Sequence, residues 1–235
     1  MCKTAVILAG GLGTRLGEHT KNTPKSLLPI NGRPILEILI CQLAKAGFTR
    51  MILAVHYFSK AIHSFCRDGS QWNVSIEYAQ EEQPLGTMGP IKQILSLPEQ
   101  FLILNSDILT DLDFAAFYDQ HVQGENLFSI AYFQHQEECA YGILEIEDQK
   151  LMGFKEKPMF DYPVNMGVYM ANRKILEYIP EHLSYSAAQL VATLLHFKQP
   201  IRALAHRGAW LDIGSMKNYE KAQNIFTKDL DCKFL

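Results

Sequence analysis

The chain has 235 residues, of which 48% are apolar, and a formal net charge of −3. This profile excludes disordered and fibrous proteins, and the absence of a Lys/Arg block argues against a nucleic-acid partner. The five cysteines are widely spaced and form no CxxC, which argues against disulfides and a zinc site. The sequence shows no signal peptide and no apolar run near the ~20 residues of a membrane helix. We therefore expect a cytoplasmic protein.

The first half of the chain alternates β-type and helix-type runs. Apolar residues at helical spacing follow each short apolar run, and Pro34 and Gly47 mark the start and end of the first helix. We predict strands at 4–9, 51–55, 74–79 and 101–107, and helices at 34–47, 59–66, 87–96 and 114–123.

The pattern changes after Gly124, where strand-like runs follow one another. A hairpin turn is predicted at 147–150, and the late helices lie between and after the last strands. We predict strands at 127–133, 141–147, 150–158, 164–172, 201–206 and 209–213, and helices at 173–179, 187–198 and 216–226.

Strand–helix alternation predicts an α/β fold with a mixed, mostly parallel sheet covered by helices on both faces. The strand-rich second half adds antiparallel pieces. No Gly/Ser- or Pro-rich linker divides the chain, so we expect a single domain over 1–235.

A glycine loop follows the first strand, in the stretch VILAGGLGTRLG at 6–17. Ligands of open α/β sheets bind beyond the carboxyl ends of the strands, and glycine-loop amides can face phosphate oxygens. Arg15 would add a fork of donors suited to a polyphosphate. The Walker spacing is absent, and Leu16 stands where the dinucleotide fingerprint needs glycine.

Lys25 lies between Pro24 and Pro29 in the segment PKSLLPI, which is too constrained for a helix and could direct the lysine toward the same phosphates. LAGGLGTRL followed by PKSLLPI closely resembles the signature of sugar-1-phosphate nucleotidylyltransferases, most like the short mannose- or heptose-1-phosphate guanylyltransferases. The resemblance implies a three-layer, Rossmann-like nucleotide-diphospho-sugar transferase fold.

The resemblance also implies a nucleotide site in which the glycine loop wraps the triphosphate. Lys25 would lie near the α-phosphate, and Arg15 would stabilise the leaving pyrophosphate. The implied nucleotide-binding residues are Leu8, Ala9, Gly10, Gly11, Gly13, Thr14, Arg15, Lys25, Glu81, Pro84, Gly86, Thr87 and Asp107.

The segment QEEQPLGTMGP resembles the base-reading segment of the family, with Met88 in place of a small residue. An ionised carboxylate at Glu81 only accepts hydrogen bonds, and guanine offers two adjacent donors to it. GTP is therefore favoured, whereas a Glu81 that points to water would leave UTP or dTTP open.

The segments FLILNSDIL and GAWLDIGSM resemble the family's two metal-binding motifs. By resemblance, Asp107 and Asp212 would bind Mg²⁺, although Ser106 replaces the usual glycine. The segments YGILEIE, FKEKP and NMGVY resemble the sugar-phosphate half of the site. The implied sugar-phosphate-binding residues are Tyr141, Gly142, Glu156, Lys157, Asn165 and Gly167.

The expected reaction joins a nucleoside triphosphate to a sugar 1-phosphate and releases pyrophosphate, with Arg15, Lys25 and Lys157 as the catalytic cations. A non-catalytic nucleotide-sugar-binding relative is an alternative that only Ser106 favours. A second alternative is a glycosyltransferase, which would require a metal-binding DxD motif after a strand. The sequence DLD at 111–113 matches that motif, but it lies just before a predicted helix.

The resemblance divides the domain into a nucleotide half at about 1–110 and a sugar-phosphate half at about 111–235. We expect no C-terminal β-helix, because no hexapeptide repeat follows the last helix. The sequence leaves open which sugar is used, and whether the chain forms a homo-oligomer.

Overall fold

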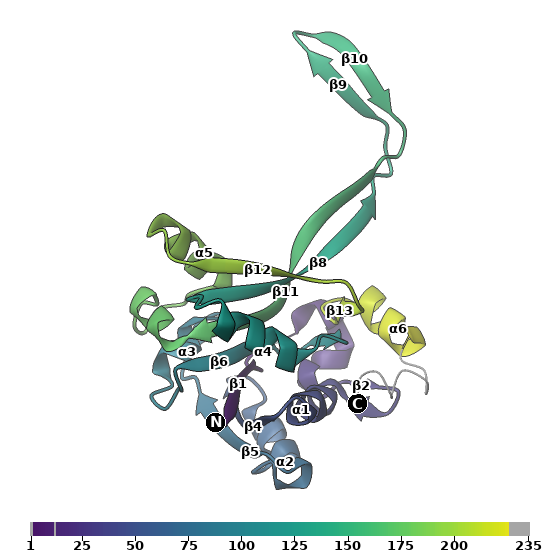
Figure 1. The fold of residues 1–235 in the computed structure, drawn as a ribbon. Helices are drawn as coiled ribbons and strands as arrows, with labels where there is room; N and C mark the ends of the chain where they lie inside the picture. The colour runs from purple at the N-terminus through teal and green to yellow at the C-terminus, as the bar shows by residue number, and fades with distance from the viewer. Residues whose placement is uncertain (1, 12, 226–235) are drawn as a thin grey trace.

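The computed structural model describes residues 2–11 and 13–225, apart from the side chains of Thr14, Arg15 and Ile225, and it centres on a seven-stranded sheet (Figure 1). The strand order is β12-β8-β11-β6-β1-β4-β5, and only β11 runs antiparallel to its neighbours. The strands are β1 (Lys3–Leu8), β4 (Phe48–Val55), β5 (Ser75–Gln80), β6 (Gln100–Asn105), β8 (Phe128–Glu138), β11 (Met159–Asn172) and β12 (Ile201–His206).

Helices cover both faces of this sheet. Alternate residues of β1 enter opposite cores: Ala5 and Ile7 pack with α1, α2, α4 and α6, whereas Val6 packs with α3, α5 and η4. This arrangement confirms the predicted three layers. The helices are η1 (Thr14–Thr20), η2 (Lys25–Leu27), α1 (Ile35–Lys45), α2 (Ser59–Cys66), η3 (Ser70–Trp72), α3 (Gly89–Gln93), α4 (Phe114–Gln123), η4 (Arg173–Tyr178), α5 (Ala187–His196) and α6 (Met216–Ile225).

Local capping explains two helix starts. The Asp113 carboxylate accepts a hydrogen bond from the Ala116 amide at 2.9 Å and begins α4. Ser186 and Gln189 form a reciprocal capping box at the start of α5. None of the helices in the described part of the chain is long and apolar enough to span a membrane.

The predicted helix at 87–96 is wrong in length, because α3 ends at Gln93 and Ile94 adopts extended geometry. Ile94 and Leu97 are still buried, whereas Leu95 is 95% exposed. The apolar residues after Gln93 are buried because an irregular turn carries them into the core. Their spacing in the sequence resembles that of a longer helix, so the pattern alone could not show where α3 ends.

Three small two-stranded sheets are separate from the main sheet: β2 (Pro29–Ile30) with β3 (Arg33–Pro34), β7 (Ile108–Thr110) with β13 (Trp210–Asp212), and β9 (Ile143–Glu147) with β10 (Lys150–Lys155). The predicted strand at 209–213 thus pairs with β7, a segment in which the sequence pattern predicted no strand. The β9–β10 turn has φ of 45° at Asp148 and 67° at Gln149, as a two-residue hairpin requires.

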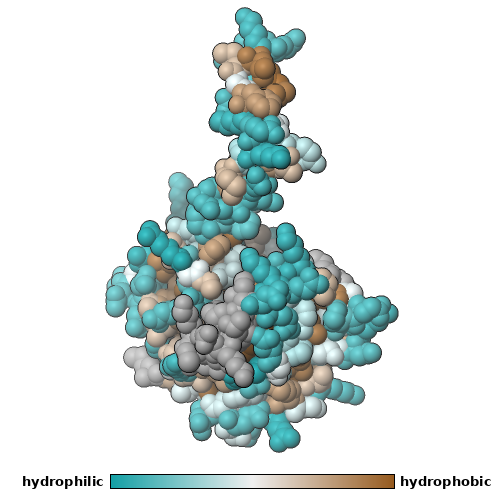
Figure 2. Space-filling model, turned by 90° about the vertical axis from the view of Figure 1, so that its right-hand side faces the viewer, coloured by the Kyte–Doolittle hydropathy of each residue, from teal (hydrophilic) through white to brown (hydrophobic). Residues whose placement is uncertain are grey.

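Residues 134–163, which we call the arm, project from the body of the protein. β8 and β11 leave the sheet while still paired and lead to the β9–β10 hairpin at the tip (Figure 1). Figure 2 shows the same projection in space-filling form, with apolar side chains gathered near its end.

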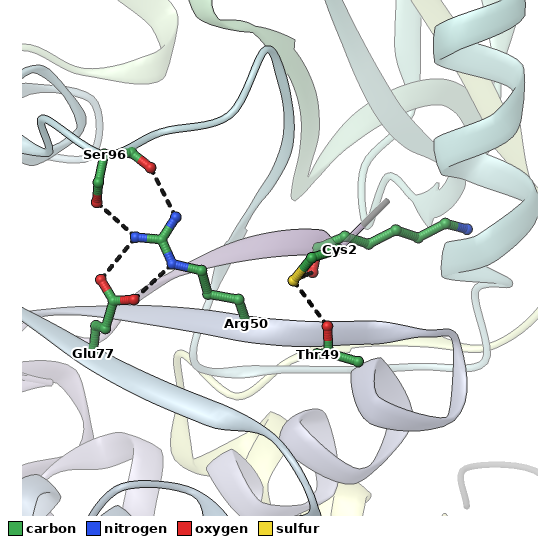
Figure 3. Close-up of polar contacts among 6 residues, drawn as sticks. Cys2, Thr49, Arg50, Glu77 and Ser96 are labelled. Atoms are coloured by element: carbon green, nitrogen blue, oxygen red, sulfur yellow. Dashed lines mark hydrogen bonds and ion pairs between the residues drawn. The ribbon is translucent and has the colours of Figure 1, made fainter.

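The opposite edge of the sheet is held by Arg50. Its guanidinium donates to both carboxylate oxygens of Glu77 at 2.6 and 2.7 Å, and to the carbonyl and hydroxyl oxygens of Ser96 (Figure 3). On the same strand, Thr49 Oγ1 lies 2.9 Å from Cys2 Sγ. Arg50 thus ties β4 to β5 and to the turn after α3.

Candidate active site

A cavity of about 560 Å³ opens where β1, β4, β5 and β6 end. These are carboxyl ends of parallel strands, the usual ligand site in an open α/β sheet. The cavity is lined by Leu8, Ala9, Gly10, Gly11, Gly13, Lys25, Ser26, Tyr57, Glu81, Pro84, Gly86, Thr87, Asn105, Ser106, Asp107 and Gly214.

Eleven of the predicted nucleotide-binding residues lie in this wall, brought from four separate segments of the chain: Leu8, Ala9, Gly10, Gly11, Gly13, Lys25, Glu81, Pro84, Gly86, Thr87 and Asp107. The side chains of Thr14 and Arg15 lie outside the described part of the structure. Ser26, Tyr57, Asn105 and Gly214 were missed. Tyr57 and Asn105 could have been found, because each lies at the carboxyl end of a predicted strand.

The glycine loop gives other side chains room to approach the cavity. A Cβ atom at position 10 would lie 2.7 Å from Glu81 Oε1, and one at position 13 would lie 3.1 Å from the Lys25 side chain. Gly13 also has a φ of 67°, which favours glycine. The segment that follows is the 3₁₀ helix η1, interrupted at Gly17.

Lys25 lies on a single 3₁₀ turn, so the prediction that this segment is non-helical is wrong for three residues. The Leu28 amide donates to the Lys25 carbonyl at 3.1 Å and closes the turn. The Lys25 ammonium pairs with Asp107 and lies 3.8 Å from Asp212 Oδ1, with only 11% of the side chain exposed. A rigid turn therefore holds one cation between two carboxylates.

The β7–β13 sheet brings these two carboxylates together. Asp212 pairs with Ile108 across the sheet, and the Ile213 amide donates to the Asp107 carbonyl at 2.8 Å. Asn218 secures the same corner by donating from its side chain to the Asp212 carbonyl at 2.7 Å. Segments far apart in the sequence therefore place their acidic side chains on one lysine.

The donor set fits a hard divalent cation. Asp107 and Asp212 offer carboxylate oxygens, and Mg²⁺ commonly uses one or two carboxylates together with substrate phosphates and water. No group of three or more His, Cys, Asp or Glu residues gathers into a metal centre among the described residues. Two carboxylates alone would make a metal site that a phosphorylated substrate completes.

Glu81 is buried, with 6% of its surface exposed, so it does not point to bulk water. Its Oε2 accepts a hydrogen bond from the Leu85 amide at 3.0 Å. Burial raises the pKa of the carboxyl, and the Leu85 amide and nearby His56 oppose that rise. A second carboxylate oxygen remains beside the cavity, next to Gly10.

The two departures from the family pattern lie in different places. Met88 is fully buried in the core that contains α3 and α5, away from the cavity wall. Ser106 does line the cavity, and its amide donates to the Leu8 carbonyl at 3.2 Å. Only Ser106 is therefore placed to affect a ligand directly.

The carboxylates of the DLD sequence are used within the fold. Asp111 Oδ1 accepts from the Ala209 amide at 2.6 Å and lies 2.9 Å from His206 Nε2. Asp113 caps α4. Both aspartates hold neighbouring segments in place, which does not favour the metal-binding role that a glycosyltransferase motif would require.

Asn165 and Gly167 lie beside the cavity but outside its lining. Asn165 Oδ1 accepts from the Gly167 amide at 2.9 Å, and Asn165 Nδ2 donates to the Tyr169 hydroxyl at 2.7 Å. Gly167 has a φ of 73° and packs against the side chain of Asn105, which lines the cavity. Their predicted sugar contact stays a prediction.

The other four predicted sugar-phosphate residues are on the arm. Tyr141, Gly142, Glu156 and Lys157 are exposed, and none of them lines the cavity. Tyr141 is 76% exposed. The structure therefore separates the predicted sugar-phosphate residues into a pair near the cavity and a group on the arm.

The chain is similar to known proteins over nearly its whole length. A sequence profile described as Nucleotidyl transferase matches residues 4–229. Mannose-1-phosphate guanylyltransferase catalytic subunit beta of Drosophila pseudoobscura pseudoobscura is 33% identical, over 96% of this chain and 63% of its own length. This chain therefore spans less than two thirds of that relative.

Two further proteins match over nearly their whole length. D-glycero-alpha-D-manno-heptose 1-phosphate guanylyltransferase of Aneurinibacillus thermoaerophilus is 31% identical, over 93% of this chain and 96% of its own. The crystal structure of HddC from Yersinia pseudotuberculosis complexed with GMP-PN has a TM-score of 0.76 at 28% identity, over 96% of this chain and 100% of that one. The predicted fold class is confirmed.

Proposed function

Because the chain belongs to the nucleotidyl transferase family, we propose that it transfers a nucleotidyl group from a nucleoside triphosphate to a sugar 1-phosphate and releases pyrophosphate. The observation that carries this proposal is the cavity in which Lys25, paired with Asp107, stands beside a glycine loop at the carboxyl ends of the parallel strands. The product would be a nucleotide-sugar for glycan biosynthesis.

The chemistry needs positioned charge rather than a general base. A phosphomonoester is already an anion near neutral pH, since its second pKa is about 6. Its oxygen attacks the α-phosphorus in line, and pyrophosphate leaves on the opposite side. The main obstacle is repulsion between two anions, so fixed cations and oriented amides carry the catalysis.

Different residues of the cavity would neutralise different parts of the substrates' negative charge. Backbone amides at Gly10, Gly11 and Gly13 would face the phosphates, and Lys25 would neutralise the α-phosphate. Arg15, whose side chain lies outside the described structure, would stabilise the leaving pyrophosphate. Asp107 and Asp212 would hold Mg²⁺, which supplies further charge neutralisation when bound.

GTP is the favoured nucleotide. The Glu81 carboxylate lines the cavity and has lone pairs beyond the one that accepts from Leu85. Guanine N1–H and N2–H₂ would match it, whereas uracil and thymine offer one donor flanked by carbonyl oxygens. The guanylyltransferase names of the two relatives and the GMP-PN ligand of HddC support the same choice.

A grid of four nucleoside triphosphates against a panel of sugar 1-phosphates, with Mg²⁺ present and pyrophosphate measured, tests the proposal. We expect the GTP column to dominate. A dominant UTP or dTTP column would contradict the role of Glu81 and retain the reaction. No pyrophosphate in any column would contradict the reaction and favour a non-catalytic nucleotide-sugar-binding protein.

The substitution Glu81→Gln tests base selection separately. It removes the charge and one acceptor while keeping the size of the side chain. We expect kcat/KM for GTP to fall about 10- to 150-fold, because hydrogen bonds to a charged group contribute about 1.5–3 kcal/mol. The neighbouring exposed Glu82 provides the control Glu82→Gln, which should leave GTP use unchanged.

A further inference from the structure

Helix α6 begins beside the second carboxylate of the cavity. Gly214, which lines the cavity, follows β13 and precedes this helix. The Ser215 hydroxyl and carbonyl oxygens accept hydrogen bonds from the Asn218 amide at 3.3 Å and the Tyr219 amide at 2.9 Å, which starts the helix. Asn218 also donates from its side chain to the Asp212 carbonyl at 2.7 Å. The first turn of α6 is therefore fastened to Asp212.

The same helix then contacts the segment that follows Lys25. The Pro29 carbonyl accepts hydrogen bonds from the Tyr219 hydroxyl at 2.8 Å and from Gln223 Nε2 at 2.7 Å. Gln223 Oε1 accepts from the Asn31 amide at 2.9 Å, and Asn31 Nδ2 donates to the Gln223 carbonyl at 3.3 Å. Figure 1 shows α6 next to both β13 and β2. Gln223 therefore fastens α6 to the short β2–β3 hairpin, mainly through its side chain.

Backbone contacts carry the position of this hairpin to Lys25. The Leu28 amide closes the 3₁₀ turn on the Lys25 carbonyl, and the Leu28 carbonyl accepts from the Ile35 amide at 3.2 Å. Pro29 follows directly, and its ring restricts the backbone φ angle of the residue whose carbonyl α6 holds. Few freely rotating bonds therefore separate the carbonyl held by Gln223 from the turn that carries the lysine.

Helix α6 thus connects the two sides of the contact between Lys25 and Asp212. The Lys25 ammonium lies 3.8 Å from Asp212 Oδ1. The β7–β13 pairing fixes Asp212 relative to Asp107, but the Lys25 turn is not part of that pairing. α6 reaches Asp212 through Asn218 and the segment after Lys25 through Gln223. One helix therefore links the lysine to a carboxylate that comes from the far end of the sequence.

The packing of α6 rests on other side chains. Ala222 is buried in the core, and Met216 and Tyr219 pack against the same core. Gln223 is only half-buried, and its side-chain hydrogen bonds lie at an exposed edge. Such hydrogen bonds add modestly to stability, whereas a misplacement of about 1 Å can cost roughly 10²-fold in rate. Loss of the Gln223 contacts should therefore shift the hairpin without unfolding the helix.

We infer that Gln223 is a positioning residue: by holding Pro29 and Asn31 against α6, it sets the place of the Lys25 ammonium between the two carboxylates of the cavity. Gln223 acts through the Lys25 turn and not on a substrate. The catalytic consequence of this inference rests on the proposed function. The placement of the lysine itself can be measured without turnover.

The substitution Gln223→Met tests the placement. Methionine keeps the length and helix propensity of glutamine and removes both side-chain hydrogen bonds. Acetylation by an N-hydroxysuccinimide ester, followed by peptide mass spectrometry, measures the reactivity of each lysine. Lys25 is 11% exposed and ion-paired, whereas Lys60 is exposed and serves as the internal reference. We expect Lys25 to react at least ~3-fold faster in the variant, because local opening becomes more frequent.

The matched control is Asn224→Met, which makes a similar change at the next, exposed position of α6. It should leave the reactivity of Lys25 unchanged. Equal Lys25 reactivity in the wild type and Gln223→Met would overturn the inference, as would an equal increase in both variants. An unfolded Gln223→Met protein would also contradict it, because the inference requires that the packing of α6 survives.

Steady-state kinetics test the catalytic consequence. In Gln223→Met, kcat should fall about 10-fold while KM for GTP changes less than ~3-fold, since a misplaced group weakens the transition state more than substrate binding. In the Lys25→Ala background, the same substitution should lower kcat less than ~2-fold further, because the group that it positions is gone. A full 10-fold loss in that background would overturn the inference. A wild type that releases no pyrophosphate with any nucleotide would instead contradict the proposed function, and the acetylation result would still decide the placement.

Discussion

The cavity and the arm arise from the same sheet but are stabilised in different ways. At the cavity, strands buried on both faces end together, and polar side chains such as Glu81 and Lys25 have partners within the chain. Along the arm, strand pairing and exposed side-chain contacts such as Lys155–Glu145 order the chain, and large apolar side chains face solvent. A prebuilt cavity suits nucleotide binding, whereas an uncovered ribbon suits contact with another molecule.

The largest expected effect is on the free energy of unfolding, and it should differ between a buried leucine of the body and an exposed leucine of the arm. Leu104→Ala in β6 empties a fully buried position and should lower the free energy of unfolding by about 2–5 kcal/mol. Leu151→Ala, at 64% exposure, should change it by less than ~0.5 kcal/mol. Urea denaturation measures both. Equal losses would mean that the arm packs against its own body.

The next effect concerns catalysis within the cavity. Lys25→Ala and Asp107→Ala should each lower kcat by roughly 10²–10³, or about 2.7–4 kcal/mol, because a positioned charge is lost. Steady-state pyrophosphate release measures this. Lys60→Ala, at an exposed site on α2, is the control and should retain normal turnover. Near-normal rates in both cavity variants would contradict their assignment.

A buried histidine of the body gives a pH-dependent test. His121 lies between Ser129 Oγ at 2.7 Å and Gln100 Oε1 at 2.9 Å, contacts that the neutral ring satisfies, and burial lowers its pKa to about 4. The unfolded chain, with a histidine pKa near 6.5, binds the proton more readily. Stability is therefore lost as the pH falls from about 6.5 to 4, by roughly 3 kcal/mol.

Urea denaturation at several pH values measures this loss. His121→Gln should be less stable than the wild type at pH 7, because it disrupts the buried contacts, but its stability should fall less between about pH 6.5 and 4. Parallel curves for the two proteins would show that His121 does not account for the acid sensitivity of the body.

The smallest effect concerns the edge of the sheet opposite the arm. Arg50→Lys removes the two-pronged contact with Glu77 and should cost less than ~1 kcal/mol, since about half of the Glu77 side chain is exposed. Thermal unfolding measures it, with Lys45→Arg as a conservative control elsewhere. A loss as large as that of Leu104→Ala would show that this edge, rather than the core, limits stability.

Local sequence signals predicted much of the fold. The bounds of α2, α4 and β12 agree with their patterns, because capping residues and regular apolar spacing act over a few residues. The pairing of β7 with β13 could not be predicted this way, since two short segments far apart in the sequence meet only in the folded chain. That pairing is what brings Asp107 and Asp212 together.

The candidate site shows the same division. The glycine loop was predicted from its place after the first strand, because ligands of open α/β sheets bind beyond the carboxyl ends of the strands. The residues after β5 and β6 were predicted only through the family resemblance. The position of Lys157 was not predicted, because a strand pattern specifies alternation and turns but not whether a hairpin folds over its own domain or extends from it. The direction of the arm is a property of the whole sheet.

A crystal structure with a non-hydrolysable GTP analogue, a sugar 1-phosphate and Mg²⁺ would test the central claim most directly. We expect the triphosphate against the amides of residues 10–13 and the Lys25 ammonium, with the ion held by the carboxylates of Asp107 and Asp212. A triphosphate bound away from this loop, or an ion away from both carboxylates, would contradict the account.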